Sequence, residues 1–250
     1  MKKTVLKPNY GGKAQLLNFL KALKSARMAD IATGKGAFLE FLTSNIGRYH
    51  EIVGIDIDPA DLGIAAKVSK RRGKVSFKVC NAERLPFPDN HFDLIGLSNA
   101  LHHIENIPVV FKEIQRVLKK SGWLLVNEMN YDRTNQAQKM HQKCHAFRAR
   151  VENLHGKTHR PVWKKMAIVN TLRKYFPEWK RVYFYYPGET YHKGNPITVK
   201  QQLGKINAAL QSCKGLKEYS SLLNKAKKIR KELNQYGVRH PSYTLTALLK

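Results

Sequence analysis

The chain has 250 residues, 42% of them hydrophobic, which suits one α/β domain with an added segment over a substrate. No run of about 18 apolar residues is present, and Met1-Lys2-Lys3 is not followed by the apolar core of a signal peptide, so we predict a cytoplasmic protein without a transmembrane segment. Three scattered cysteines argue against a disulfide framework: Cys80, Cys144 and Cys213.

The net charge of +27 is the unusual feature of the composition. Residues 1–127 carry 20 Lys and Arg against 11 Asp and Glu, whereas residues 128–250 carry 25 against 7. A strong positive field attracts RNA, DNA, anionic lipid or acidic small molecules, but Lys-rich surfaces also serve solvation alone. Charge therefore permits a nucleic-acid partner without specifying one.

The first elements alternate between helix and strand. Leu16, Leu20 and Leu23 share one face of a helix predicted over Lys13–Ser25. A short strand over Met28–Ile31 then runs into a loop with two glycines, and a helix resumes after it. The order strand, glycine loop, helix is typical of a ligand-binding βα unit.

Further strands follow at regular intervals, each separated by a helix or a turn. We predict strands over Ile52–Ile55, Val75–Cys80, Phe92–Leu97 and Trp123–Val126, with a helix over Val109–Leu118 before the last. Such alternation indicates a parallel sheet with helices on both faces. Ligands of such sheets bind beyond the carboxyl ends of the strands.

The pattern changes after Glu128. We predict partly helical structure in the basic, His-rich segment, then a helix over Val162–Tyr175 and a strand over Arg181–Tyr186. Two Lys-rich helices occupy 197–235, and Tyr243–Leu249 is a final strand. The stretch between the last two strands is too long for a hairpin, so we interpret it as an inserted cap.

A cofactor site is indicated by the glycine loop and the acid after the second strand. Gly34 and Gly36 allow a sharp turn and a close ligand approach, and free N–H groups at the following helix can meet an anion. Asp56 follows twenty residues after Gly36, where a carboxylate can accept both ribose hydroxyls. Asp56 alone is equally compatible with a helix cap.

Taken in order, the motifs resemble those of class I S-adenosylmethionine-dependent methyltransferases, within them the branch of the ubiquinone/menaquinone biosynthesis methyltransferases (the type 11 methyltransferase domain). The segments that carry the resemblance lie within residues 28–128. They are Asp30–Gly36, Gly54–Pro59, Asn81–Asp93, Ala100–Ile104 and Glu113–Gly122.

The resemblance implies a fold and its divisions. The fold would be α/β, with a Rossmann-like, seven-stranded, mostly parallel sheet, helices on both faces and a helical cap inserted before the last strand. We divide the chain into an N-terminal helix (1–27), an S-adenosylmethionine-binding core (28–130), a basic helical substrate-side segment (131–160) and the completion of the sheet (161–250), with the cap at 197–235.

The resemblance also implies roles for cofactor-binding residues. The glycine loop would pack on the methionyl part, Asp30 would hold its ammonium, Asp56 would bind the ribose and Ile57 would pack on the adenine. The full predicted set is Asp30, Ala32, Thr33, Gly34, Gly36, Asp56, Ile57, Asn81, Ala82 and Ser98. A nicotinamide dinucleotide is disfavoured because Phe38 and Leu39 follow Gly36, where that fingerprint needs a third glycine.

Candidates for a catalytic base are His102 and His103, after the fourth strand, and Glu128, at the end of the fifth; of these we select His103 and Glu128. A base is needed only when the acceptor is a hydroxyl, an acidic carbon or a protonated amine. For each histidine we favour the simpler interpretation, a loop residue hydrogen-bonded to the backbone. Tyr131, Tyr185, Tyr186 and Tyr191 are candidates for an aromatic acceptor pocket or for plain sheet packing.

Histidines concentrate in the segment after the fifth strand. His155 and His159 stand four residues apart, a spacing that suits one helix face and one metal, but Gly156 weakens that helix and no Cys-x-x-Cys supports it. We therefore predict no metal and interpret the group as pocket-lining or solvated: His141, Cys144, His145, His155 and His159.

Three functions remain open at this stage. We favour transfer of a methyl group from S-adenosylmethionine to a small-molecule acceptor, leaving S-adenosylhomocysteine. The alternatives are a methyltransferase acting on RNA or another polyanion through the basic second half, and a non-catalytic cofactor-binding protein. The basic residues near the C-terminus motivate the polyanion methyltransferase, although no RNA-binding module of known pattern accompanies them. They are Lys225, Lys227, Lys228, Arg230 and Lys231.

Overall fold

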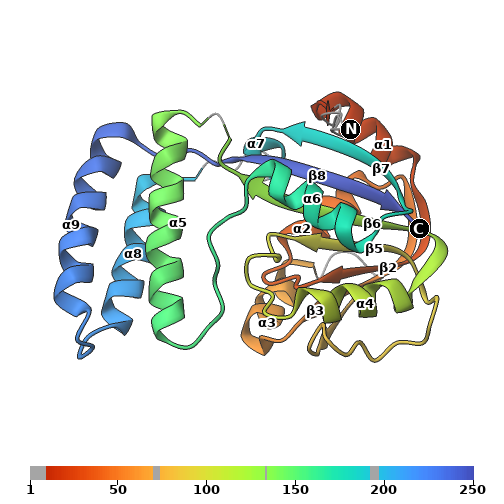
Figure 1. Ribbon diagram of the computed structural model, residues 1–250, viewed down its shortest axis with the longest axis horizontal. Coiled ribbons are helices and arrows are strands. Elements are labelled where there is room, and N and C mark those ends of the chain that lie inside the picture. The colour runs from red at the N-terminus through yellow and green to blue at the C-terminus, as the bar shows by residue number, and fades with distance from the viewer. Residues whose placement is uncertain (1–9, 70–73, 133, 192–196) are drawn as a thin grey trace, which may run out of the picture.

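An eight-stranded sheet forms the centre of the protein in a computed structural model that describes residues 10–69, 74–132, 134–191 and 197–250 (Figure 1). The strand order is β1-β7-β8-β6-β5-β2-β3-β4, and β8 is the antiparallel strand. The predicted mostly parallel sheet is thus confirmed, with one short edge strand more than expected. The strands are β1 Tyr10–Gly11, β2 Lys24–Ile31, β3 Arg48–Asp56, β4 Val75–Val79, β5 Phe92–Ser98, β6 Leu118–Asn130, β7 Lys180–Tyr186 and β8 Ser242–Leu249.

Helices cover both faces of the sheet and form the cap. Local sequence explains several of their ends: Asn135 with Gln138, and Thr198 with Gln201, form capping boxes that begin α5 and α8. The helices are α1 Lys13–Ala22, α2 Ala37–Asn45, α3 Pro59–Ser69, α4 Ile107–Val117, α5 Gln136–Leu154, α6 Lys165–Tyr175, α7 Gly188–Tyr191, α8 Val199–Ser212 and α9 Tyr219–Tyr236.

Side-chain alternation along the strands divides the hydrophobic core between the two faces of the sheet. Ile95 of β5 belongs to the cluster that α4 and α6 cover, which includes Phe111. Its neighbour Leu94 belongs to the opposite cluster, which α1 and α2 cover and which includes Leu20 and Phe38. The sheet is therefore buried on both faces, as parallel sheets are.

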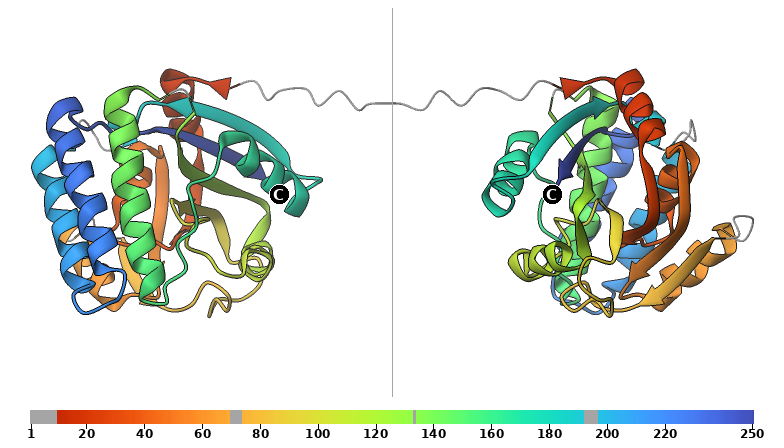
Figure 2. Two further views of the ribbon diagram at one scale, coloured as in Figure 1. Left: turned by 60° about the vertical axis from the view of Figure 1, so that its left-hand side comes forward. Right: turned by 90° about the vertical axis from the view of Figure 1, so that its right-hand side faces the viewer.

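Three helices, α5, α8 and α9, pack side by side as a bundle at one end of the molecule (Figures 1 and 2). We call this bundle the cap. It has a hydrophobic core of its own, built around Phe147, Ile206, Ile229 and Leu233. The cap lies beyond the carboxyl ends of the parallel strands, so it stands next to the edge where ligands of such sheets bind (Figure 1).

Several element boundaries differ from the sequence predictions: β3 and β6 extend further at both ends than predicted, and α6 begins at Lys165 rather than Val162. The first helix ends at Ala22 rather than Ser25, because Leu23 adopts an extended conformation (ψ 133°) and β2 begins at Lys24. Helix α5 ends at Leu154, so His155 and His159 lie beyond it and do not share a helix face. None of the helices in the described ranges has the length and hydropathy needed to cross a bilayer.

Candidate functional site

The glycine loop between β2 and α2 shapes one wall of a cavity. Ala32, Gly34 and Gly36 all have positive φ (53°, 51° and 84°), so the backbone reverses tightly before α2. A Cβ on Gly36 would lie 3.1 Å from Cβ of Ala65, and its φ is one that L side chains rarely adopt. Glycine at this position therefore lets α2 begin against α3.

A cavity of about 670 Å³ lies at the carboxyl ends of β2, β3, β4 and β5. Its size is within the range of small-molecule sites. The structure brings most of the predicted residues together in its lining: Ala32, Thr33, Gly34, Asp56, Ile57, Asn81, Ala82, Ser98 and His103. Asp30, Gly36 and Glu128 do not line it.

Backbone amides hold Asp56 in place at the cavity wall. The N–H of Gly34 donates to Oδ2 (2.7 Å) and the N–H of Asp58 donates to Oδ1 (3.0 Å). Each carboxylate oxygen keeps a further acceptor site, which suits a vicinal diol. Ile57 follows directly, lines the cavity and is 67% exposed. A flat ring bound in the cavity could pack on this apolar side chain.

Asp30 lies beneath the glycine loop and is fully buried. The Thr33 hydroxyl donates to its Oδ2 (2.5 Å), whereas Oδ1 has no hydrogen-bond partner. Burial raises the pKa of Asp30 to about 7. A buried carboxyl group with an unused oxygen is a site for an external cationic donor or water.

A chain of polar contacts closes the far end of the cavity. Asn127 donates to the Ser98 hydroxyl (3.0 Å), which lies 3.4 Å from the Tyr191 hydroxyl. The Tyr186 hydroxyl in turn donates to Asn127 Oδ1 (2.5 Å). Of the four predicted tyrosines, Tyr191 lines this cavity and Tyr131 lines a second one described below, while Tyr186 is fully buried in the sheet.

Glu128 is buried at the end of β6 and accepts the backbone N–H groups of Ala100 and Leu101 through Oε1 (2.8 and 2.9 Å). Its other oxygen, Oε2, lies 3.4 Å from Nδ1 of His102. Glu128 therefore fixes the loop that carries His102 and His103 rather than facing the cavity itself.

Four histidines gather beside this loop. His102 and His103 come from the core, His145 from α5, and His159 from the connection after α5. The ring centroids of His103 and His159 are 4.1 Å apart, and Nε2 of His145 lies 3.3 Å from Nε2 of His159. Desolvation, followed by the neighbouring imidazoles, lowers the pKa of His103 to about 3 and that of His145 to about 2.

Glu152 joins the histidine group from α5. Its Oε2 lies 2.6 Å from Nδ1 of His159, and this hydrogen bond lowers the pKa of Glu152. Glu152 and Lys157 also line the cofactor-side cavity, so the cap contributes to its wall. Sequence analysis missed both residues, and the only available signal was their place in the His-rich segment.

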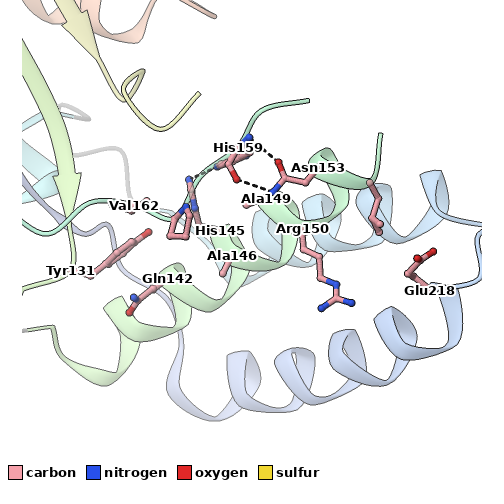
Figure 3. Close-up of a pocket in the computed structure, with 12 residues that line it drawn as sticks. Tyr131, Gln142, His145, Ala146, Ala149, Arg150, Asn153, His159, Val162 and Glu218 are labelled. Atoms are coloured by element: carbon pink, nitrogen blue, oxygen red, sulfur yellow. Dashed lines mark hydrogen bonds between the residues drawn. The ribbon is translucent and has the colours of Figure 1, made fainter. Parts of the chain in front are cut away.

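A second cavity of about 510 Å³ is lined mainly by residues of α5 and of the segment that follows it (Figure 3). Its lining mixes apolar side chains such as Ala149 and Val162 with polar ones, and His145 and His159 point into it. His103 on the first cavity and His159 on the second are in ring contact, so the histidines separate the two cavities.

The histidines that the sequence analysis treated as one group lie in different parts of the structure. His141 pairs with the Tyr131 hydroxyl (2.8 Å), and His155 pairs with the Ser212 hydroxyl (3.2 Å) on the cap. Cys144 is buried in the core of the cap. Only His145 and His159 of that group come together, and they do so with His102 and His103, which the spacing did not connect.

Comparison with known proteins defines the class that this fold and cavity fit. Residues 29–126 match the family model described as methyltransferase domain. The resemblance to class I methyltransferases predicted from the motifs is thereby confirmed for the core of the chain. The matched segment runs from β2 to β6 and contains the glycine loop, Asp56 and Ser98.

Individual proteins with sequence or structural similarity are known in several organisms. Over 107 residues the chain is 35% identical to the ubiquinone/menaquinone biosynthesis C-methyltransferase UbiE of Shewanella sp. (strain ANA-3). The aligned segment covers 42% of this chain and 43% of that protein. The chain thus spans less than half the length of the curated relatives it matches.

Solved structures extend the likeness to nearly the whole chain at the level of the fold. A SAM-dependent methyltransferase from Thiobacillus denitrificans in complex with S-adenosyl-L-homocysteine has a TM-score of 0.57 at 14% identity, covering 94% of this chain and 89% of that one. The [4+2]-cyclase SpnF has a TM-score of 0.54 at 20% identity, covering 94% and 78%. At these identities the likeness shows the fold alone, and the fold serves more than one chemistry.

Proposed function

We propose that the protein transfers a methyl group from S-adenosylmethionine to a small-molecule acceptor. The observation that carries the proposal is the cavity at the strand ends, where an amide-anchored Asp56 and an exposed Ile57 stand beside the positive-φ glycine loop. The matched methyltransferase domain and the curated relatives, which are named C-methyltransferases, support the same function.

The residues of the cavity fit the parts of this methyl donor. Asp56 would accept the two ribose hydroxyls, Ile57 would cover one face of the adenine, and Asn81 and Ala82 would meet its edge. The glycine loop would lie against the methionyl part, and the unpartnered oxygen of Asp30 would attract its ammonium, directly or through water. Ser98 and Tyr191 would then border the methyl end.

The chain's own groups would hold the acceptor in line and keep water away. S-adenosylmethionine supplies a methyl carbon already activated by a positive sulfur. Because that charge is lost in the transition state, an enclosed site of low polarity favours transfer. The aromatic packing of Phe38, Tyr191 and Tyr243 behind the methyl end provides such surroundings. His103 faces the cavity, and Glu128 would position its loop rather than take up the proton.

Calorimetric titration with S-adenosylmethionine and S-adenosylhomocysteine tests the proposal through Asp56→Ala. We expect the wild type to bind both ligands, and the variant to bind at least about 100-fold more weakly, because each of the two hydrogen bonds to the charged group is worth about 1.5–3 kcal/mol. Glu51→Ala is the matched control, since Glu51 is an exposed acid five residues before Asp56 on the same strand. Equal affinities for both variants would reject the ribose assignment.

A polyanionic acceptor is the second candidate, favoured by the charge of the second half of the chain. The lysines of α9 are exposed on the cap, and residues of the cap line both cavities. Phosphate contacts from such side chains give binding that weakens steeply with salt.

A further inference from the structure

The histidine group between the two cavities contains buried ring nitrogens that hydrogen bonds within the protein do not satisfy. His102 is 1% exposed, and neither of its ring nitrogens makes a hydrogen bond, although Nδ1 lies 3.4 Å from Glu128 Oε2. Buried polar atoms are rarely left in this state, because the loss of solvation is not repaid. Nε2 of His102, which has no polar partner among the described residues, is therefore available to a ligand.

Three imidazoles offer ligand atoms close to one another. One nitrogen each of His102, His103 and His159 lies within 4.8 Å of the others. We propose that these three residues bind a Zn²⁺ ion at the boundary between the two cavities. Imidazole nitrogen is a preferred zinc ligand, and three protein ligands with one open position is the usual form of a zinc site that acts on a substrate.

In two of the three rings a carboxylate lies beside one nitrogen. Nδ1 of His159 bonds Glu152 Oε2 at 2.6 Å, and Nδ1 of His102 faces Glu128. A backbone group of Thr158 hydrogen-bonds to His103. Metal-binding histidines are oriented in this way, because a partner on one nitrogen turns the lone pair of the other toward the ion.

The three nitrogens must approach one another when the ion binds. Zn–N bonds of about 2.0–2.1 Å in a tetrahedron place two ligand atoms about 3.3 Å apart. His103 is exposed on the cavity and can turn to close the gap. His145, whose Nε2 lies 3.3 Å from that of His159, would give up this hydrogen bond as the ion takes its place.

Where the proposed function holds, the ion defines a class of acceptor. The open position would be on the cavity side, next to His103, where it can bind the oxygen or sulfur of a hydroxyl or thiol. Binding lowers the pKa of that group, so its proton leaves to solvent. The freed lone pair then forms the bond to the methyl carbon as the carbon–sulfonium bond breaks, and its electron pair stays on the sulfur of the neutral thioether.

Metal titration of the full chain, after removal of bound metal with a chelator, tests the site without the methyl donor. We expect one Zn²⁺ per chain, and a visible spectrum of four-coordinate geometry when Co²⁺ is added instead. His103→Ala and His159→Ala should each weaken binding at least 100-fold, and Glu152→Gln should weaken it about 10–100-fold. His155→Ala is the matched control, since His155 is an exposed histidine of the same region outside the cluster.

The outcomes separate the site from the function. Absence of stoichiometric binding in the wild type, or equal losses in His155→Ala and His159→Ala while circular dichroism shows all variants folded, would overturn the metal site. Loss of the ion in His145→Ala would overturn the assigned ligand set. Calorimetry with S-adenosylmethionine on the same samples reports on the proposed function independently.

A thiol probe tests the open position. Addition of 2-mercaptoethanol to the Co²⁺-loaded wild type should produce a thiolate-to-metal charge-transfer band, because the sulfur can enter the first coordination shell. No band at saturating thiol would mean a closed site and would contradict the inferred class of acceptor.

Discussion

The core and the cap of this protein both pack around a hydrophobic centre, but their functional residues are not equally predictable from sequence. In the core, strand ends, glycines and acids recur in a fixed order, and the structure gathers them around one cavity. The cap has only an amphipathic pattern, seen in Leu222, Ala226, Ile229 and Leu233 along α9, which predicts a helix and a buried face but no ligand.

The core and the cap region come into contact at the histidine group, which takes residues from both. His102 and His103 belong to the core, whereas His145 and His159 belong to the region that forms the cap. Cofactor binding is thus predicted to depend mainly on the core, and the choice of acceptor on the contact between the two. The following predictions test that division.

The largest effect is expected from cavities in the two hydrophobic cores. Phe111→Ala should destabilise the sheet region by about 3–5 kcal/mol, because it empties a fully buried site under α4. Leu233→Ala should cost about 2–5 kcal/mol but act on the cap, which has its own core. All three tryptophans lie outside the cap helices, so their fluorescence reports the core and circular dichroism reports both regions.

In urea, Phe111→Ala should move the fluorescence curve to lower urea by more than the circular dichroism curve, because the cap helices contribute to the second signal alone. Leu233→Ala should move the circular dichroism curve to lower urea than the fluorescence curve and leave the affinity for S-adenosylhomocysteine within a few-fold. Coincident shifts for Leu233→Ala would show that core and cap unfold as one unit.

The next effect concerns pH and Asp30. With a pKa of about 7, this carboxyl group is largely protonated at pH 6 and cannot pair with the cofactor ammonium. The affinity for S-adenosylmethionine should therefore fall about tenfold per unit as the pH is lowered from 7 to 5. The lowered pKa values of His103 and His145 keep these residues neutral in that range. Calorimetry on Asp30→Asn should give a flat profile, and an equally steep profile there would contradict the assignment.

The smallest effect is expected from the surface charge of the cap. Replacing Lys225, Lys227, Lys228 and Lys231 with Gln should lower the salt concentration that elutes the protein from heparin, because each exposed lysine contributes to phosphate-like contacts. The matched control replaces four exposed lysines of the core, Lys74, Lys78, Lys112 and Lys120. Equal shifts would mean general charge attraction and would count against a polyanion-binding face on the cap.

Much of the core could be predicted from sequence, because its motifs impose backbone conformations. Gly34 and Gly36 adopt the positive φ values that their residue type favours, and Asp56 stands where the alternation of strands places it. The edge strand β1 was missed because two residues carry no periodicity. The first helix was drawn three residues too long because Leu23 continues the apolar stripe after the backbone has become extended.

The contact of cap and core could not be predicted, because it joins residues far apart in sequence. Spacing suggested that His155 and His159 share a helix face, but α5 ends at Leu154 and the turn sends His159 back toward the core. His102 lies 43 and 57 residues from His145 and His159, a separation that no local pattern spans. Glu128 was ranked as a base by its place at a strand end, a pattern that does not reveal its hydrogen bonds to the N–H groups of Ala100 and Leu101.

A crystal structure of the protein soaked with S-adenosylhomocysteine would test the central claim most directly. We predict density for one ligand at the carboxyl ends of β2 to β5, with ribose oxygens in hydrogen-bond reach of Asp56 and the adenine against Ile57. Density at another place, or no ligand in this cavity at saturating concentration, would contradict the account.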